Sequence, residues 1–325
     1  MENPILEGCR YVVKNASYVK IKENKIKDAA KEIYSPSISP PSWDFYPFPP
    51  REDEDKRKDE IYNFFLFLDA NNFCFWRKKG SNLDKWSYSY KEKTSSGAGG
   101  LWLLCRKLYD EGKFNPNSLD FFLKLEEKNA KELFGEIPLI EERVKIWREV
   151  AENLKNYNCS FRSLIEQNNR DIEKILKILI TEFPQAFWDV SSYKNKPIPF
   201  LKKALLLLGM IQGRFGIFDE RDVKKEMTVY ADYQLPRVLR YLGILEYSFS
   251  LAKKVDNLEI IPRDSEEEVE IRASTIIASK MIEKEIEKIG RINPVIMDYL
   301  IWKKSREEEF KKNAKPHHLT ITTCY

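Results

Sequence analysis

Apolar residues recur at intervals of three and four positions through most of the sequence beyond Gly97. This spacing places the apolar side chains on one face of an α-helix, and that face must pack against a neighbouring element to leave water. Gly112 closes the first such segment at a natural C-cap position, and Pro138 stands near the first turn of the next. We therefore predict a helical body over about residues 97–310. Its other periodic segments are 160–183, 199–212, 235–247, 269–289 and 294–310.

A second pattern indicates β-structure between residues 61 and 92. The stretch IYNFFLFLDANNFCFW at 61–76 is dense in aromatic residues around a polar turn, and KWSYSY at 85–90 alternates polar and aromatic residues. Both patterns are typical of short strands. We predict two strands within 61–76 and a third at 85–90, which together make a small antiparallel β element inserted into the helical body. The predicted fold class is mainly α, of the α+β type.

Residues 1–60 form the predicted N-terminal part of the chain. Spaced apolar residues between 4 and 34 indicate one or two short helices. The proline-rich stretch PSISPPSWDFYPFPP at 36–50 and the charge run REDEDKRKDE at 51–60 follow, and we expect neither to continue a regular element. We predict a long ordered loop there, followed by a single domain over 61–325 that ends in a C-terminal tail.

Composition excludes several kinds of site. Lysine and arginine total 55 against 51 acidic residues, and these charges are spread along the chain, so we do not expect a nucleic-acid partner. The five cysteines have no metal-ligand or redox spacing, and the two histidines are the adjacent His317 and His318. This argues against a zinc site or a Ser-His-Asp triad. We expect catalysis by carboxylates, with no metal and no other cofactor.

The sequence also bears on location. No uninterrupted apolar stretch reaches the roughly 18 residues of a membrane-spanning helix. The first residues lack a charged-then-apolar signal pattern, and the scattered cysteines suit a reducing compartment. We therefore expect a cytoplasmic protein without a membrane partner.

The most informative segment is TVYADYQLPRVLRYLGIL at 228–245, in which Asp232 precedes a helix predicted to run from about Leu235. Free backbone N–H groups and the positive end of the helix dipole favour an ionised carboxylate there. A fixed anion could stabilise the positive charge that builds on a sugar when its C–N bond breaks, or could attack the sugar covalently. An aspartate ahead of a helix is commonly an N-cap and nothing more, so spacing alone leaves both interpretations open.

A second cluster lies in LDANNFCFW at 68–76. Asp69, Asn71 and Asn72 fall in a predicted turn, and Phe75 and Trp76 follow. A guanine-like edge offers N–H donors to a carboxylate and an acceptor to an amide, while aromatic faces can stack on a base. An ordinary hairpin turn explains the same residues.

Basic residues near predicted helix starts could hold a phosphate. They are Lys202 and Lys203 in PIPFLKKALLLL at 197–208, and Arg272 in EEVEIRAS at 267–274. Lysines on helix faces are more commonly just solvated. The glycine-rich TSSGAGG at 94–100 has neither the P-loop nor the Rossmann spacing, and we interpret it as a turn that lets the backbone approach something closely.

Taken in order, these segments resemble the queuosine-salvage protein family, the queuosine 5′-phosphate N-glycosidases. The block YADYQLPRVLRYLGILEYS at 230–248 is the most specific, and the resemblance spans nearly the whole chain. The other matching pieces are NFCFW at 72–76, DEG at 110–112, PLIEER at 138–143, FP with a following DV pair at 183–190, FLKKA at 200–204, EVEIRA at 268–273, MDYLIW at 297–302, and a terminal segment with His318 and Tyr325.

The resemblance implies a fold similar to the helix-hairpin-helix DNA glycosylases with additions. It implies hydrolysis of the N-glycosidic bond of queuosine 5′-phosphate, or of a related 7-deazaguanine nucleotide, to release the queuine base, with this small-molecule nucleotide as the partner. Asp232 inherits the catalytic role. The implied substrate-binding residues are Asp69, Asn72, Phe75 and Trp76 for the base, Lys202 for the 5′-phosphate, and Tyr233 and Arg237 for the ribose side.

The chain departs from the family at a few positions. Ala98 and Gly99 stand where the family commonly has an aromatic pair, and Lys203 stands where it often has arginine, which weakens bidentate phosphate recognition. Two alternatives remain open at this level. One is a DNA or nucleoside glycosylase of other specificity, and the other is a non-catalytic helical binding protein in which Asp232 is only a cap.

Overall fold

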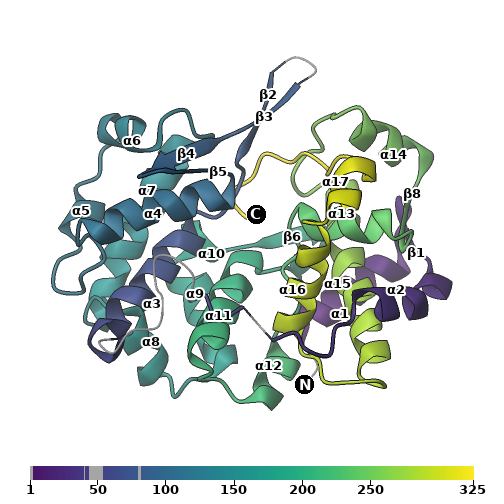
Figure 1. Ribbon diagram of the computed structural model, residues 1–325, viewed down its shortest axis with the longest axis horizontal. Coiled ribbons are helices and arrows are strands. Elements are labelled where there is room, and N and C mark those ends of the chain that lie inside the picture. The colour runs from purple at the N-terminus through teal and green to yellow at the C-terminus, as the bar shows by residue number, and fades with distance from the viewer. Residues whose placement is uncertain (1–2, 40, 44–53, 80–81) are drawn as a thin grey trace. The chain divides into compact units, whose positions relative to one another are not determined.

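The computed structural model describes residues 3–39, 41–43, 54–79 and 82–325 (Figure 1). The chain divides into two compact units. Unit 1 contains Met1–Pro41, Asp189–Leu205 and Asp219–Ile321, and unit 2 contains Ser42–Trp188, Leu206–Phe218 and Thr322–Tyr325. Helices dominate both units, and all strands in the described residues pair in two-stranded antiparallel sheets. The predicted mainly α class, with a minor β component, is confirmed.

Helix α15, Glu266–Ile286, forms the centre of unit 1. Ser265 caps its first turn by accepting the N–H of Glu268, and three glutamates in that turn complement the helix dipole. Helices α1 (Pro4–Lys14) and α2 (Ile26–Ile33) pack against α15, which is buried along most of its length. A helix buried on so many sides has polar side chains in the core, and these must find partners there.

Glu270 of α15 is one such side chain. Its carboxylate accepts the backbone N–H groups of Ser17, Tyr18 and Val19 at 2.6–3.1 Å and the hydroxyl of Tyr193 at 2.9 Å. This fixes the start of strand β1 (Val19–Ile21), which pairs antiparallel with β8 (Leu245–Tyr247). The β1–β8 sheet thus joins segments that are distant in the sequence.

The rest of unit 1 surrounds α15. Strands β6 (Val190–Tyr193) and β7 (Lys196–Pro199) form a hairpin whose two loop residues, Lys194 and Asn195, both have positive φ, as a tight hairpin turn requires. Helix α13 (Gln234–Tyr241) packs against α15 and against α16 (Pro294–Lys304). The helices of this part are α11 (Lys202–Phe215, which begins in unit 1), α12 (Glu220–Glu226), α13 (Gln234–Tyr241), α14 (Phe249–Asp256), α16 (Pro294–Lys304) and α17 (Glu308–Asn313).

An aromatic core holds unit 2 together. Phe67 of α3 (Glu54–Ala70) stacks on Phe122, with ring centroids 3.8 Å apart, and Trp147 of α7 (Ile140–Leu154) packs edge-on against both. The indole N–H of Trp147 donates to the carbonyl of Phe67 at 2.7 Å, so the ring is buried without losing its hydrogen bond. This core fixes the C-terminal end of α3, from which the predicted base-binding turn extends.

Two β-hairpins come after α3 in the chain. They are β2–β3 and β4–β5, and helix α4 packs on β4–β5. A Cβ at Gly100 would meet the carbonyl oxygen of Ser95 at 2.9 Å, so the glycine-rich stretch does allow a close backbone approach. The remaining elements of unit 2 are β2 (Trp76–Lys79), β3 (Asn82–Lys85), β4 (Ser87–Tyr90), β5 (Lys93–Ser96), α4 (Ala98–Asp110), α5 (Asp120–Leu123), α6 (Glu127–Phe134), α8 (Phe161–Gln167), α9 (Ile172–Glu182) and α10 (Pro184–Phe187).

Several predicted elements are wrong in detail. Residues 61–70 are the buried second half of α3 and not a strand, and the charge run becomes helical from Glu54 onward. The segment 160–183 breaks into α8 and α9 because Asn169 and Arg170 take positive φ, and 235–247 ends in strand β8. The two N-terminal helices and a strand within 85–90 are confirmed. Much of the predicted 36–50 loop, from residue 44 on, lies outside the described residues.

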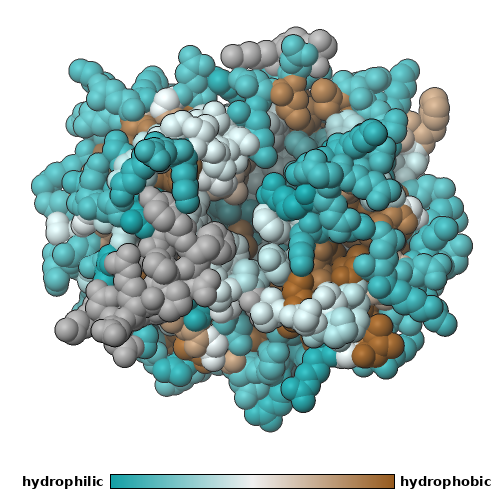
Figure 2. Space-filling view, viewed as in Figure 1, coloured by the Kyte–Doolittle hydropathy of each residue, from teal (hydrophilic) through white to brown (hydrophobic). Residues whose placement is uncertain are grey.

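On the face seen in Figure 2, hydrophilic side chains predominate and hydrophobic ones are scattered between them. Within the described residues, none of the helices combines the length and the apolar character needed to cross a bilayer.

Candidate active site

Asp232 caps the N-terminus of α13. Its Oδ1 accepts the backbone N–H of Gln234 at 2.7 Å and that of Leu235 at 3.0 Å. The side chain is half-buried. The predicted position of Asp232 at a helix start is therefore confirmed, and two of the helix's free N–H groups hold one carboxylate oxygen in place.

The backbone around Asp232 is held by side chains from distant parts of unit 1. Tyr230 N–H donates to Asp298 Oδ1 at 2.8 Å, and Arg272 Nε donates to the Ala231 carbonyl at 3.2 Å. Tyr233 adds a bond of its own side chain, whose hydroxyl donates to the backbone carbonyl of Thr320. The carboxylate of Asp232 therefore extends from a backbone fixed on both sides.

Burial raises the pKa of Asp232, although the Lys202 ammonium and the N–H groups of Leu235 and Gln234 oppose the rise. The helix terminus has the predicted stabilising effect on the anion, but desolvation is the larger effect. A carboxylate held in a desolvated position interacts strongly with positive charge that develops next to it.

Asp298 of α16 is a second buried carboxyl group near Asp232. Burial raises its pKa well above the ordinary range and the charge of Asp232 raises it further, while the Tyr230 N–H and Lys202 act in the opposite direction. Two carboxyl groups with one ammonium nearby favour a state in which one of the acids keeps its proton. In the sequence, Asp298 is one position of MDYLIW with no local sign of a role, because its neighbourhood depends on contacts between distant segments.

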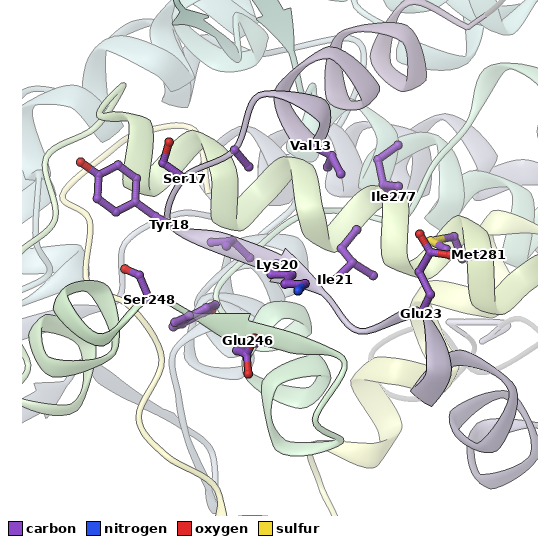
Figure 3. A pocket seen from close by; sticks show the side chains of 13 residues that line it. Val13, Ser17, Tyr18, Lys20, Ile21, Glu23, Glu246, Ser248, Ile277 and Met281 are labelled. Atoms are coloured by element: carbon purple, nitrogen blue, oxygen red, sulfur yellow. The ribbon is translucent and has the colours of Figure 1, made fainter.

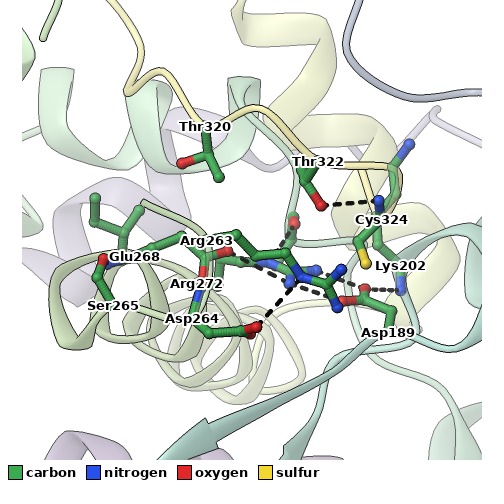
Figure 4. A network of polar contacts seen from close by, with 12 residues as sticks. Asp189, Lys202, Arg263, Asp264, Ser265, Glu268, Arg272, Thr320, Thr322 and Cys324 are labelled. Atoms are coloured by element: carbon green, nitrogen blue, oxygen red, sulfur yellow. Dashed lines mark hydrogen bonds and ion pairs between the residues drawn. The ribbon is translucent and has the colours of Figure 1, made fainter. Parts of the chain in front are cut away.

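Lys202 begins α11 in a dense polar network (Figure 4). Its backbone N–H donates to Asp189 Oδ2 at 2.9 Å, and both oxygens of Asp189 accept from the guanidinium of Arg272 at 2.8 and 2.6 Å. Glu268 Oε1 lies 3.6 Å from Nη1 of Arg272. Arg272 is 1% exposed and its fork binds Asp189, so its guanidinium is not presented to a phosphate, one of the possibilities that the sequence left open.

Tyr233 and Arg237, the predicted ribose-side residues, contact the segment that follows α17. The ring of Tyr233 lies 5.1 Å from that of His317 and 5.2 Å from that of His318. Arg237 donates from Nε to the Lys315 carbonyl at 2.6 Å. His318 is buried, and burial, with His317 adding to it, lowers its pKa well below the ordinary range, so its imidazole is neutral at physiological pH.

In unit 2, the predicted base-binding turn begins where α3 ends, and not between two strands as predicted. Asp69 is fully buried, and Asn72 donates from Nδ2 to Asp69 Oδ1 at 3.2 Å. Phe75 is half-buried and stacks on Trp86 with 6.1 Å between the ring centroids, and Trp76 opens β2. The carboxylate, the amide and the two aromatic rings predicted to bind the base thus all belong to one short segment of unit 2.

Arg143 of α7 holds this turn. Its guanidinium, fully buried, donates to the carbonyl oxygens of Asn71, Phe73 and Cys74 at 2.6–3.0 Å, and it lies 4.1 Å from the centre of the Phe73 ring. Burial lowers the pKa of Arg143 to about 9. Arg143 could not be recognised from the sequence, because an arginine at a helical position in PLIEER gives no signal that it is buried.

The predicted site residues therefore fall into two groups, one in each unit. Asp232, Lys202, Tyr233 and Arg237 belong to unit 1, and the turn residues 69–76 belong to unit 2. A separate cavity of about 620 Å³ lies in unit 1 beside β1 and α15. Figure 3 shows its labelled lining, which includes Tyr18, Glu246 and Met281 and none of the predicted site residues.

Known proteins with similar sequences match nearly the whole chain. The model of the queuosine salvage protein family matches residues 52–325. A Sphaerobacter thermophilus protein named queuosine 5′-phosphate N-glycosylase/hydrolase is 29% identical over 332 residues, covering 99% of this chain and 97% of its own. Proteins of the same name from Mus musculus and Dictyostelium discoideum are 27% and 29% identical; they cover 98% and 94% of this chain and 98% and 89% of their own.

Proposed function

The chain belongs to the queuosine salvage protein family, and on this premise we propose that it hydrolyses the N-glycosidic bond of queuosine 5′-phosphate and releases queuine. The names of the bacterial and eukaryotic relatives support this activity. In structural terms, the observation that carries the proposal is the Asp232 carboxylate, held by two backbone N–H groups in a desolvated position close to the charge of Lys202.

The chemistry assigned to Asp232 follows from the reaction. As the bond between the anomeric carbon and the base nitrogen breaks, positive charge builds on the ribose, and an anion next to it stabilises that transition state. Water then gives its oxygen to the anomeric carbon and a proton to the departing base. The products are free base and ribose 5-phosphate. Asp232 is well suited to this role because it needs no reorganisation when the charge develops.

The base needs help to leave, because a 7-deazapurine has carbon where guanine has N7 and so cannot be protonated there. Hydrogen bonds to the edge of the base must supply this help. They must be donated to O6 or N3, where negative charge collects as the base departs. We assign recognition of the base edge to Asp69 and Asn72 of unit 2, and stacking on the base to Phe75 and Trp76. A carboxylate such as that of Asp69 accepts N–H donors of the kind that a guanine-like edge offers.

In unit 1, we assign the 5′-phosphate to Lys202 and the ribose side to Tyr233 and Arg237. Lys202 supplies a positive charge close enough to Asp232 to lower the pKa of that carboxyl group. We further propose that the enzyme acts in the cytoplasm on the free nucleotide and not on nucleic acid. Within the described residues the five cysteines form no disulfide, which suits a reducing compartment.

Release of free base tests the proposal. Purified protein is incubated with queuosine 5′-phosphate, queuosine, guanosine 5′-phosphate and queuosine-containing tRNA, and the free base is followed by mass. We expect queuine from the queuosine nucleotide and none from the guanosine nucleotide or the tRNA. Folded protein that releases base from none of the four would contradict the proposed activity.

A further inference from the structure

The guanidinium of Arg272 connects two parts of unit 1 that carry proposed site residues (Figure 4). On one side, Nε donates to the carbonyl oxygen of Ala231 at 3.2 Å, the residue directly before Asp232. On the other side, Nη1 and Nη2 donate to the two oxygens of Asp189 at 2.8 and 2.6 Å. One rigid planar group therefore links the segment before α13 with Asp189.

Asp189 in turn fixes the start of α11. Its Oδ2 accepts the N–H of Lys202 at 2.9 Å, and its carbonyl oxygen accepts the N–H groups of Phe200 at 2.9 Å and Leu201 at 3.3 Å. Leu201 has φ of 53°, a left-handed conformation that a leucine adopts only when its surroundings hold it. The position of Lys202 thus depends on Asp189.

The pair is buried at some energetic cost. Arg272 and Asp189 are 1% and 2% exposed, and the guanidinium lies 4.0 Å from the centre of the Phe200 ring. The attraction within a buried ion pair does little more than offset the lost hydration, so well-packed apolar residues would serve stability equally well. What apolar residues cannot provide is directional bonds to the Ala231 carbonyl and, through Asp189, to the Lys202 N–H.

We propose that the Arg272–Asp189 pair is a positioning element that holds the Asp232 carboxylate and the start of α11 at Lys202 in fixed register, so that binding of the 5′-phosphate contributes to cleavage of the glycosidic bond. This inference rests on the proposed function, in which Asp232 acts at the ribose and Lys202 binds the phosphate. A nucleotide held at its phosphate places its anomeric carbon correctly only if the distance between the two residues is fixed.

Two variants test this proposal. Arg272→Lys keeps the charge that Asp189 needs but cannot bind Asp189 in a fork and the Ala231 carbonyl at the same time. Asp189→Asn keeps the shape and an acceptor for the Lys202 N–H but removes the charge that Arg272 binds. Both are assayed by single turnover on queuosine 5′-phosphate and queuosine. We expect the ratio of kcat/KM for the 5′-phosphate to that for the nucleoside to fall on the order of tenfold to a hundredfold.

Arg240→Lys is the matched control. Arg240 lies on α13, and its Nη1 binds Asp256 at 2.8 Å without contacting the 189–202 segment or Ala231. It should leave the ratio unchanged. An Arg272→Lys enzyme that loses activity equally on both substrates, or loss of the fold in both test variants, would show a purely structural role and overturn the proposal. If the wild-type protein cleaves neither substrate, the proposed function itself fails.

Discussion

The Oδ1 atom of Asp298 accepts the backbone N–H of Tyr230 at 2.8 Å, two residues before Asp232. Asp298 is buried on α16, where burial and the charge of Asp232 raise its pKa well above the ordinary range. One acid next to the proposed catalytic carboxylate therefore keeps its proton to a higher pH than an ordinary aspartate does. It fixes the backbone without placing a second full negative charge beside the first.

We predict that Asp298→Asn becomes more stable relative to wild type as the pH rises. When an acid has a higher pKa in the folded than in the unfolded state, the protein loses stability as the pH rises from the unfolded-state pKa through the folded-state pKa. Asparagine does not ionise and keeps an acceptor for the Tyr230 N–H. The stability difference, from urea unfolding at about pH 5 and about pH 8, should grow by at most about 1.4 kcal/mol per pH unit. Equal differences at both pH values would contradict the prediction.

We expect the buried neutral His318 to make the fold sensitive to acid. The pKa of His318 is lowered in the folded state. Below the ordinary histidine pKa of about 6.5, the unfolded chain therefore binds a proton at this residue that the folded chain does not bind. Stability should fall there, and His318→Gln should remove this part of the loss. Denaturant unfolding at about pH 7 and about pH 5.5 measures it. An acid dependence unchanged in His318→Gln would refute the account.

Arg143→Lys should loosen the turn of unit 2. A lysine ammonium cannot reach the carbonyl oxygens of Asn71, Phe73 and Cys74 together, so at least one buried acceptor loses its donor. We expect a loss of about 1–3 kcal/mol in the free energy of unfolding and weaker binding of free queuine. Arg148→Lys, also on α7, is the matched control, because Arg148 donates to the Leu125 carbonyl. Similar losses in both variants would show that the turn does not depend on Arg143.

The pH profile of hydrolysis should depend on Lys202. The role proposed for Asp232 requires an anion, so kcat/KM should fall as the pH falls through its raised pKa. The Lys202 ammonium opposes that rise, so its removal in Lys202→Met should move the acid limb of the profile to higher pH. The measurement is the pH at the midpoint of the acid limb. Weaker phosphate binding lowers kcat/KM at every pH and does not by itself move that midpoint. A limb that stays in place or moves to lower pH would argue against this electrostatic role.

Local signals explain what could be predicted from the sequence. The cap at Asp232 depends on residues within three positions of it, and Gly112 indeed takes positive φ after α4. The error at 61–70 has a physical cause. Phe64 to Leu68 are all buried, so this part of α3 has no polar face and no helical periodicity, and its aromatic residues suggested a strand.

The residues that were missed share a different property. Asp298, Arg143 and Asp189 each bind at least one partner that lies 68 to 83 positions away in the sequence. No local pattern distinguishes them from residues on a solvated helix face or in a loop. The sequence shows Arg272 as a basic residue near a predicted helix start. Its burial and its hydrogen bonds to Asp189 follow only from the folded structure.

In the proposed function, Asp232 is catalytic and more than a helix cap. Asp232→Asn tests it most directly, because asparagine caps a helix about as well as aspartate and should cost at most about 1 kcal/mol of stability. Asp219→Asn is the control, since Asp219 caps α12 by accepting the Arg221 N–H at 2.8 Å. The measurement is the rate of queuine release from queuosine 5′-phosphate. We predict a fall of at least about a hundredfold for Asp232→Asn and a near wild-type rate for Asp219→Asn. A folded Asp232→Asn enzyme that keeps the wild-type rate would contradict the claim.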